Sequence, residues 1–186
     1  MPYFSDETFQ NLGSSDFQIG EYSDCTFVGC NFASLNFHGS SFENCQFRDC
    51  DFSNAKVFKV SFQEVKLERC KVLGIQFNTA NPFLLEFRFE NCQLDYCNFF
   101  NLKLKKSIFK NCSLVEVDFS QAELQESVFE GCNLAGAVFD QTQLEKADFR
   151  GAINFRIDPE INKVKGAIFD LEGLPGLLGK YGIRLG

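Results

Sequence analysis

Residues 25–52 read CTFVGCNFASLNFHGSSFENCQFRDCDF, and in this stretch phenylalanine returns at every fifth position from Phe27 to Phe52. The same period runs from Leu12 to Phe77, slips by two residues, and resumes from Phe89 to Phe149, with all 27 central positions apolar. In an α-helix five residues rotate by roughly 140°, so these side chains would scatter around the cylinder. The period therefore excludes an amphipathic helix and predicts another regular structure.

The positions around each central residue define the repeating unit. The residue two before the centre is small or apolar, and neither of these two positions carries a charge. Buried first and third residues around an exposed second one are typical of a very short β-strand. Gly, Asn and Asp are frequent two residues after the centre, where they favour tight turns. Alternating strands and corners predict an all-β coil with flat sides.

The second half of the array adds a ten-residue period, because Phe and Leu alternate strictly at the centre from Phe89 to Phe149. A four-sided coil would stack Phe on Phe along two opposite sides and Leu on Leu along the other two. A two-sided coil satisfies the alternation as well, so the period alone leaves both forms open.

Several units, such as Cys-Asn-Phe at 30–32, Cys-Asp-Phe at 50–52, Cys-Asn-Leu at 132–134 and Ala-Asp-Phe at 147–149, resemble the A/C-D/N-L/F-x-x unit of pentapeptide-repeat proteins. The resemblance implies a right-handed quadrilateral β-helix, a pentapeptide-repeat solenoid with about twenty residues per coil. We therefore expect an N-terminal lead-in at 1–11, the β-helix at 12–169, and a C-terminal helix and tail at 170–186.

The array has one interruption and a weakened end. Residues 78–88, NTANPFLLEFR, insert two residues and include Pro82, which predicts a bulge, a kink or a short loop, with a functional loop as the alternative. Phe169 follows Phe149 by twenty residues, which predicts one more degenerate coil. The other centres of that coil would be Asn154, Pro159 and Val164.

The tail resembles a short helix, because Pro175 suits its first position and Gly182 the position after its last turn. Its apolar stripe either caps the open end of the solenoid or pairs two copies, together with a strand at Ile183-Arg184-Leu185. Residues 154–183 resemble the end segment of the quinolone-resistance (Qnr-type) and albicidin-resistance pentapeptide proteins. That resemblance implies a homodimer in which the contacts are made by Leu174, Leu177, Leu178, Tyr181 and Ile183.

The nine cysteines raise the question of a metal or catalytic site. All of them fall in the inward column, and their tight spacing is C-x4-C, whereas zinc sites favour C-x2-C. The single histidine, His38, flanks an outward corner, so it is not expected to activate a buried thiol. We expect the cysteines to serve in packing, and we expect no enzymatic activity, no metal and no cofactor.

Composition narrows the class of protein further. The chain of 186 residues is 45% apolar and contains 24 Phe, which excludes a disordered chain. No apolar run approaches the ~20 residues that span a bilayer, so no membrane association is expected. No export signal is visible, and together with the many cysteines this predicts a cytoplasmic location. A net charge of −7 argues against direct nucleic-acid binding.

The charge is arranged in bands along the chain: net −7 over 1–55, +5 over 56–110, −7 over 111–148 and +2 over 149–186. Such a band either keeps the rod soluble or docks a basic partner. The candidate partner-binding residues of the acidic band are Glu116, Asp118, Glu123, Glu126, Glu130, Asp140 and Glu145. The basic band departs from a uniformly acidic rod through Lys56, Lys59, Lys66, Arg69, Lys71, Lys103, Lys105, Lys106 and Lys110.

The resemblance to the Qnr-type subgroup implies a function for the acidic band. Proteins of that subgroup imitate duplex DNA and occupy the DNA-binding saddle of type II topoisomerases. The expected function is thus a non-catalytic DNA mimic that binds DNA gyrase or topoisomerase IV and gives resistance to fluoroquinolones or other topoisomerase poisons. The alternative is a pentapeptide-repeat scaffold that binds a different basic protein surface.

Overall fold

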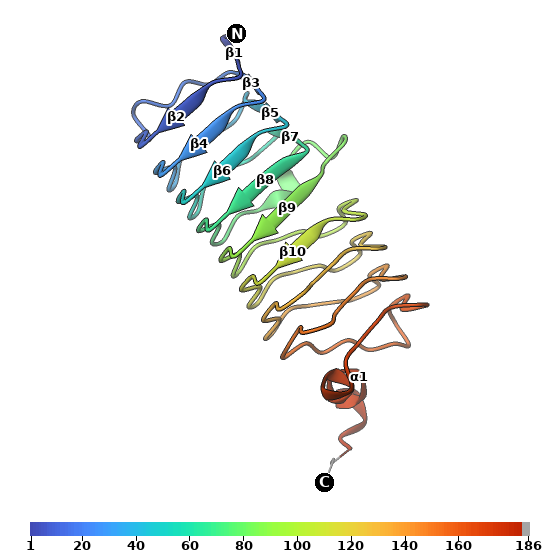
Figure 1. Cartoon of the computed structure of the whole chain (residues 1–186). Coiled ribbons are helices and arrows are strands. Elements are labelled where there is room, and N and C mark those ends of the chain that lie inside the picture. Colours follow the sequence, from blue (N-terminus) through green and yellow to red (C-terminus); the bar gives the residue numbers. More distant parts are fainter. Residues whose placement is uncertain (184–186) are drawn as a thin grey trace.

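The computed structural model describes residues 1–183 and forms a right-handed, four-sided β-helix, with the N-terminus at one end of the rod and a short helix at the other (Figure 1). The strands are β1 (Tyr3–Ser5), β2 (Thr8–Gln10), β3 (Glu21–Ser23), β4 (Thr26–Val28), β5 (Ser41–Glu43), β6 (Gln46–Arg48), β7 (Ser61–Gln63), β8 (Val65–Glu68), β9 (Phe87–Glu90) and β10 (Ile108–Lys110). The helical segments are η1 (Phe77–Thr79), η2 (Leu171–Gly173), α1 (Pro175–Leu178) and η3 (Gly179–Tyr181).

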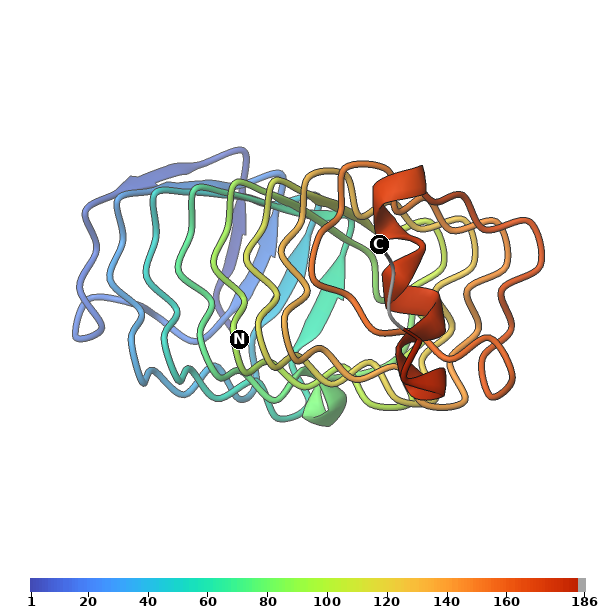
Figure 2. The same cartoon turned by 90° about the horizontal axis from the view of Figure 1, so that it is seen from below.

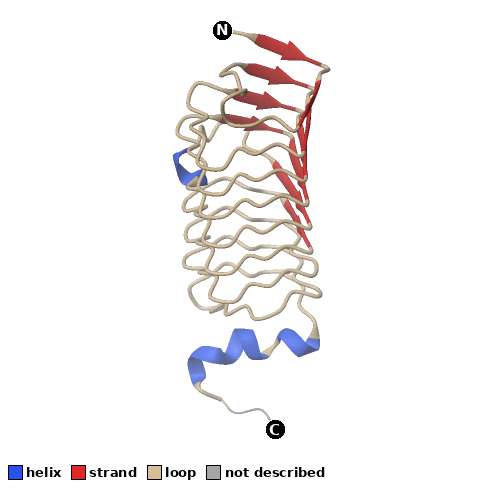
Figure 3. Ribbon diagram, turned by 90° about the vertical axis from the view of Figure 1, so that its left-hand side faces the viewer, coloured by secondary structure: helices blue, strands red, loops and turns tan. Residues whose placement is uncertain are grey.

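All strand pairs are parallel, and they line two adjacent sides of the rod (Figure 3). One sheet has the order β1-β3-β5-β7 and the other β10-β9-β8-β6-β4-β2. Isolated parallel bridges continue the same ladders toward the C-terminal end, and they also form the ladders of the other two sides. The four sides are named here in chain order by their central residues. Side A holds Tyr22, Phe42, Phe62, Leu104, Leu124 and Leu144; side B holds Phe27, Phe47, Leu67, Phe89, Phe109, Phe129 and Phe149; side C holds Phe32, Phe52, Val72, Leu94, Leu114 and Leu134; side D holds Phe37, Val57, Phe77, Phe99, Phe119 and Phe139.

The interior confirms four sides. On side B the rings of Phe109, Phe129 and Phe149 stack with centroids 5.1 and 4.7 Å apart. On the opposite side D, Phe99 stacks on Phe119 at 5.3 Å. Leucines occupy the corresponding positions of sides A and C. The alternation of Phe and Leu therefore arises because successive units face four directions in turn.

The conserved chemistry of each unit has a local cause. The Asp or Asn before a centre turns its Oδ1 back to accept the N–H two residues on, as in Asp51 to Ser53 and Asp118 to Ser120, both 2.8 Å. This bond sets the corner that follows the strand. The corner residue then adopts a positive φ, as Gly131 does at 67°. Repeating this pair of features turns the chain at each corner.

The interruption is a short loop, as the sequence predicts. Leu67 pairs with Phe89, so this coil spans 22 residues. The two extra residues are accommodated on side A by η1 and residues 80–86, where Leu85 is buried and Phe83 is exposed. Beyond the loop the ladders resume their 20-residue spacing.

The two ends differ from the expectation. β1 and β2 pair with β3 and β4, so the sheets begin within residues 1–11, where a lead-in was expected. Tyr3 pairs with Glu21, an offset of 18 residues that hides this coil from the five-residue count. At the other end Asn154 and Pro159 are exposed, and Phe155 and Ile157 fill the interior in their place.

Candidate partner-binding surface and C-terminal end

The acidic residues of 111–148 form a ring around the rod. The bridges place Glu123 on the ladder of side A, Asp148 on that of side B and Asp118 on that of side D. Glu116 and Glu126 stand at corners, both with positive φ. The acidic band therefore faces outward in several directions, and no single side of the rod carries it.

Basic residues on neighbouring coils partly neutralise the ring. Lys105 Nζ lies 3.0 Å from Glu123 Oε2, and Lys110 Nζ lies 3.3 Å from Glu130 Oε2. Both pairs are solvent-exposed to a large degree, so each contributes at most about 1 kcal/mol. The candidate residues outside these pairs include Glu116, Glu126 and Asp140, and all three are exposed.

Not every candidate carboxylate projects freely. Glu123 and Glu145 are half-buried, and the Oε2 atom of Glu145 is enclosed without a hydrogen-bond partner. Asp118 is also half-buried because its Oδ1 forms the turn with Ser120. Exposed acids therefore offer the best contacts for a partner, a distinction that the five-residue pattern does not contain.

The basic band is interleaved with acids on side B. Lys66 stands between Glu64 and Glu68, and the next coil repeats this order with Arg88 between Glu86 and Glu90. The excess positive charge of 56–110 therefore lies elsewhere on the surface of these coils. On side B the columns of alternating sign stabilise neighbouring coils and do not form a basic patch.

The C-terminal helical segment lies across the end of the solenoid (Figures 2 and 3). Pro175 is the first residue of α1, and Gly182 ends the segment with a left-handed φ of 62°, as predicted. Gly176 packs directly on Phe155: a Cβ atom at Gly176 would lie 2.4 Å from the Phe155 carbonyl oxygen. The Gly176 carbonyl also accepts a 3.0 Å hydrogen bond from the Ile157 N–H.

An ionic clasp holds the end of this segment. Lys180 Nζ lies 2.7 Å from Asp158 Oδ1 and 2.6 Å from Glu160 Oε2, and the Tyr181 hydroxyl donates to Glu160 Oε1 at 2.7 Å. The bond with Lys180 lowers the pKa of Asp158 below its ordinary value. The pKa of Glu160 is lowered by the same ammonium and then by the Tyr181 hydroxyl. The clasp thus joins η3 to the last coil.

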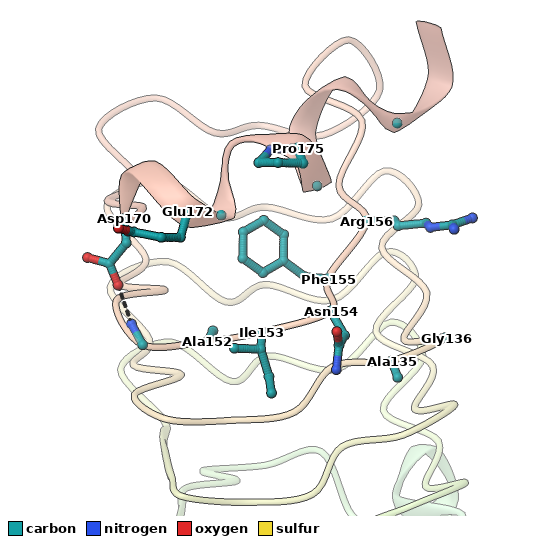
Figure 4. A pocket seen from close by; sticks show the side chains of 14 residues that line it. Ala135, Gly136, Ala152, Ile153, Asn154, Phe155, Arg156, Asp170, Glu172 and Pro175 are labelled. Carbon is teal, nitrogen blue, oxygen red and sulfur yellow. Dashed lines mark hydrogen bonds between the residues drawn. The ribbon is translucent and has the colours of Figure 1, made fainter. Parts of the chain in front are cut away.

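A groove of about 970 Å³ lies between the helical segment and the last coil (Figure 4). Phe155 stands at its centre, with Arg156 on one side and Asp170 on the other. Asp170 is fixed because its Oδ2 accepts a 2.5 Å bond from the Gly151 N–H.

The predicted dimer residues divide into two sets. Leu177 packs against the core of its own chain and Leu178 is half-buried. Leu174, Tyr181 and Ile183 are exposed by 42, 54 and 56%. Leu171, which the sequence interpretation missed, is 81% exposed beside them. Arg184 and Leu185, part of the predicted strand, lie outside the described residues.

The cysteines are all unpaired and buried, as expected for the inward column. Burial raises the pKa of Cys45 and of Cys97 to about 12, which leaves these thiols protonated. His38 is exposed at a corner, and its ring lies against Phe58 with centroids 5.5 Å apart. Within residues 1–183 no three His, Cys, Asp or Glu side chains are grouped to hold a metal ion, and no helix is long and apolar enough to cross a membrane.

This architecture defines a parallel β-solenoid built on a five-residue unit. The family model described as "Pentapeptide repeat region" matches residues 10–77 and 102–156, and the chain belongs to the pentapeptide-repeat family. The gap between the two matches contains the phase slip and its loop.

Solved structures agree on the fold. A trypsin-treated variant of QnrB1, a plasmid-mediated fluoroquinolone resistance protein, superposes with a TM-score of 0.75 at 19% identity, covering 99% of this chain and 91% of that one. A second trypsin-treated QnrB1 variant gives a TM-score of 0.53 at 18% identity, with coverages of 99 and 100%. No curated protein matches the sequence.

Proposed function

We propose that this protein is a non-catalytic DNA mimic that binds DNA gyrase or a related type II topoisomerase and modulates it, giving resistance to fluoroquinolones or other topoisomerase poisons. The observation that carries the proposal is the ring of exposed carboxylates at 111–148. A ring of charge suits a DNA-binding groove, because a groove contacts a rod from more than one side.

The charge density of the ring is close to that of DNA. Residues 111–148 occupy about two coils, or ~10 Å at ~4.8 Å per coil. Duplex DNA carries roughly six phosphate charges over that length. The net charge of this segment is −7. The comparison favours local mimicry by this ring, since the basic band excludes mimicry along the entire rod.

The proposal includes a homodimer through the C-terminal end. The exposed apolar residues Leu171, Leu174, Tyr181 and Ile183 support it, because contiguous apolar surface on a soluble protein marks an interaction site. Joining two copies there would bring both acidic rings toward the centre of one longer rod. The doubled acidic segment would then face the middle of the topoisomerase groove.

A second candidate is a scaffold that binds a different basic surface. The +5 charge of residues 56–110 favours it, because a basic band interrupts the resemblance to DNA. This candidate shares the acidic ring as the contact surface. The two candidates differ in the identity of the partner and so in the outcome of a topoisomerase assay.

The test is a gyrase supercoiling assay in which purified protein is titrated with and without a fluoroquinolone, together with a direct binding measurement. The double variant Glu116→Lys/Glu126→Lys reverses two exposed charges of the ring. The control Glu43→Lys/Glu64→Lys makes the same change in net charge at two exposed acids outside it. Glu64 and Glu126 also share a positive φ at their corners.

We expect the wild-type protein and the control to bind the topoisomerase and the ring variant to lose at least ten-fold in affinity, as the loss of desolvated charge contacts costs 2–5 kcal/mol in round terms, ~1.4 kcal/mol being ten-fold. Equal loss in the two variants would show that net charge alone matters. No binding, no inhibition and no drug protection by the wild-type protein would refute the topoisomerase proposal and leave the scaffold.

A further inference from the structure

Six of the nine cysteines form one continuous row inside the rod. They precede the centres of side C on six successive coils, and all are at most 3% exposed. The row consists of Cys30, Cys50, Cys70, Cys92, Cys112 and Cys132. Parallel bridges join each residue that follows one of these cysteines to its counterpart on the next coil, so the row stays in register, even across the 22-residue coil.

The six side chains share one orientation. Each Sγ lies within 3.2–3.8 Å of two carbonyl oxygens, one two residues earlier and one on the preceding coil. Neighbouring rungs also touch: the Cys30 N–H lies 3.4 Å from Cys50 Sγ, and the Cys70 N–H lies 3.4 Å from Cys92 Sγ. Because the orientation repeats, adjacent sulfurs are separated by about one strand spacing, ~4.8 Å.

This separation fits one kind of metal coordination. An ion with two collinear ligands and metal–thiolate bonds of ~2.3 Å holds its sulfurs about 4.6 Å apart. Zinc is excluded, because it requires four ligands in a tetrahedron, and no group of three or more exists among residues 1–183. Soft thiolate ligands select soft ions, and mercury(II) is the soft ion that is stable with two linear thiolates.

Charge favours the same ion. Two thiols and one mercury(II) ion react to form two Hg–S bonds and release two protons, so the product is a neutral bis-thiolate. The apolar interior therefore gains no net charge, whereas a monovalent soft ion would leave a buried negative charge at a large cost. No oxidant or reductant is needed, since neither sulfur nor metal changes its oxidation state.

We propose that the cysteine row binds soft, linear two-coordinate metal ions, with mercury(II) as the best fit, each ion held between adjacent rungs. Six cysteines then take three ions. The separate neighbours Cys25 and Cys45, paired in register through β4 and β6, take a fourth. Cys97 takes none, because Ile75 and Val117 occupy the rungs on either side of it. Each bound ion joins two coils, so binding also staples the rod.

The test uses the full chain, mercury(II) chloride and an excess of glutathione, which removes ions held by a single thiol. Native mass spectrometry counts retained ions, and the ultraviolet absorption of the Hg–S bond reports two-coordinate binding. The triple variant Cys50→Ala/Cys92→Ala/Cys132→Ala leaves no adjacent pair in the row. Alanine occupies the equivalent buried position natively at Ala55, Ala122 and Ala147, so the fold should accept it.

We expect four retained ions in the wild-type protein, one in the triple variant and three in Cys50→Ala alone. Cys97→Ala is the matched control, because it removes an equally buried thiol that has no neighbour, and it should retain four. Retention of fewer than two ions by the wild-type protein, unchanged retention in the triple variant, or an equal loss in Cys97→Ala would each overturn the proposal. Circular dichroism of every variant verifies that the solenoid is intact before the counts are compared.

Discussion

A methyl group at Gly176 should detach the C-terminal helical segment from the last coil. In Gly176→Ala the new Cβ would lie 2.4 Å from the Phe155 carbonyl oxygen and 2.7 Å from two atoms of its ring. Ordinary contact requires about 3.5 Å, so the segment must move by roughly 1 Å. Backbone and a buried ring line this contact, and neither can turn aside as a flexible side chain could.

The cost follows from what that movement breaks. The Gly176 carbonyl accepts the Ile157 N–H at 3.0 Å, and an unmade buried bond of this kind costs about 1–3 kcal/mol. Overpacking against Phe155 adds a similar amount if the bond is kept instead. Alanine is a better helix former than glycine by about 1 kcal/mol, which offsets part of either loss. The net expectation is a local destabilisation of about 1–3 kcal/mol.

Gly179→Ala is the matched control, because a Cβ there meets nothing within 4 Å and the residue has an ordinary helical φ of −55°. It should stabilise the same segment by about 0.4–1 kcal/mol. Hydrogen exchange at the Ile157 amide is the proper assay, since the end of a solenoid can open without global unfolding. Exchange should accelerate by roughly 5- to 150-fold in Gly176→Ala and slow by about 2- to 5-fold in Gly179→Ala. Unchanged exchange in Gly176→Ala would refute the packing argument.

Two further predictions concern the interior and the clasp. Phe129→Ala should cost about 3–5 kcal/mol in urea denaturation, since it empties the centre of the side B stack, whereas Phe58→Ala at an exposed corner should change stability by about 0.5 kcal/mol or less. In the clasp, the lowered pKa values of Asp158 and Glu160 stabilise the fold above their unfolded values near ~4. That stability is lost as the pH falls through the lowered values. Lys180→Met should therefore loosen the segment at neutral pH, and NMR of the segment should show the difference vanish in acid; a difference that persists in acid would contradict the ionic origin.

The repeat made the fold predictable because one rule governs the whole interior. A buried centre every five residues, a small residue two before it and a turn after it are local requirements that every coil repeats. The phase slip was also readable, since a shift of two in the count can only be a 22-residue coil, as the pairing of Leu67 with Phe89 shows. Strict alternation of Phe and Leu then fixed the stacks of sides B and D.

The parts that escaped prediction are those where neighbours in space outweigh the local rule. Phe155 takes an interior place that the count assigned to Asn154, because the glycines of the helical segment leave room for its ring. Corners at Glu116 and Glu126 adopt positive φ without Gly or Asn, and the ladder above and below holds them in a conformation that costs of order 1–3 kcal/mol in isolation. Enclosure of Glu145 Oε2 depends on side chains twenty residues away, which the five-residue unit does not record.

The geometry of the coil also explains why the acidic band is a ring. Successive units face sides A, B, C and D in turn, so acids that are close in sequence point in different directions. A stripe on one side requires acids spaced by about twenty residues, whereas a dense run of about forty residues encircles the rod. In this chain Asp118, Glu123 and Asp148 lie on three different ladders although only 30 residues separate the first from the last. Duplex DNA likewise carries charge around its axis, so a partner that distinguishes a ring from a stripe would bind this surface from several sides. Moving the charge of Glu116 and Glu126 onto one side at constant total would therefore weaken binding under the DNA-mimic proposal and leave it unchanged under simple charge attraction.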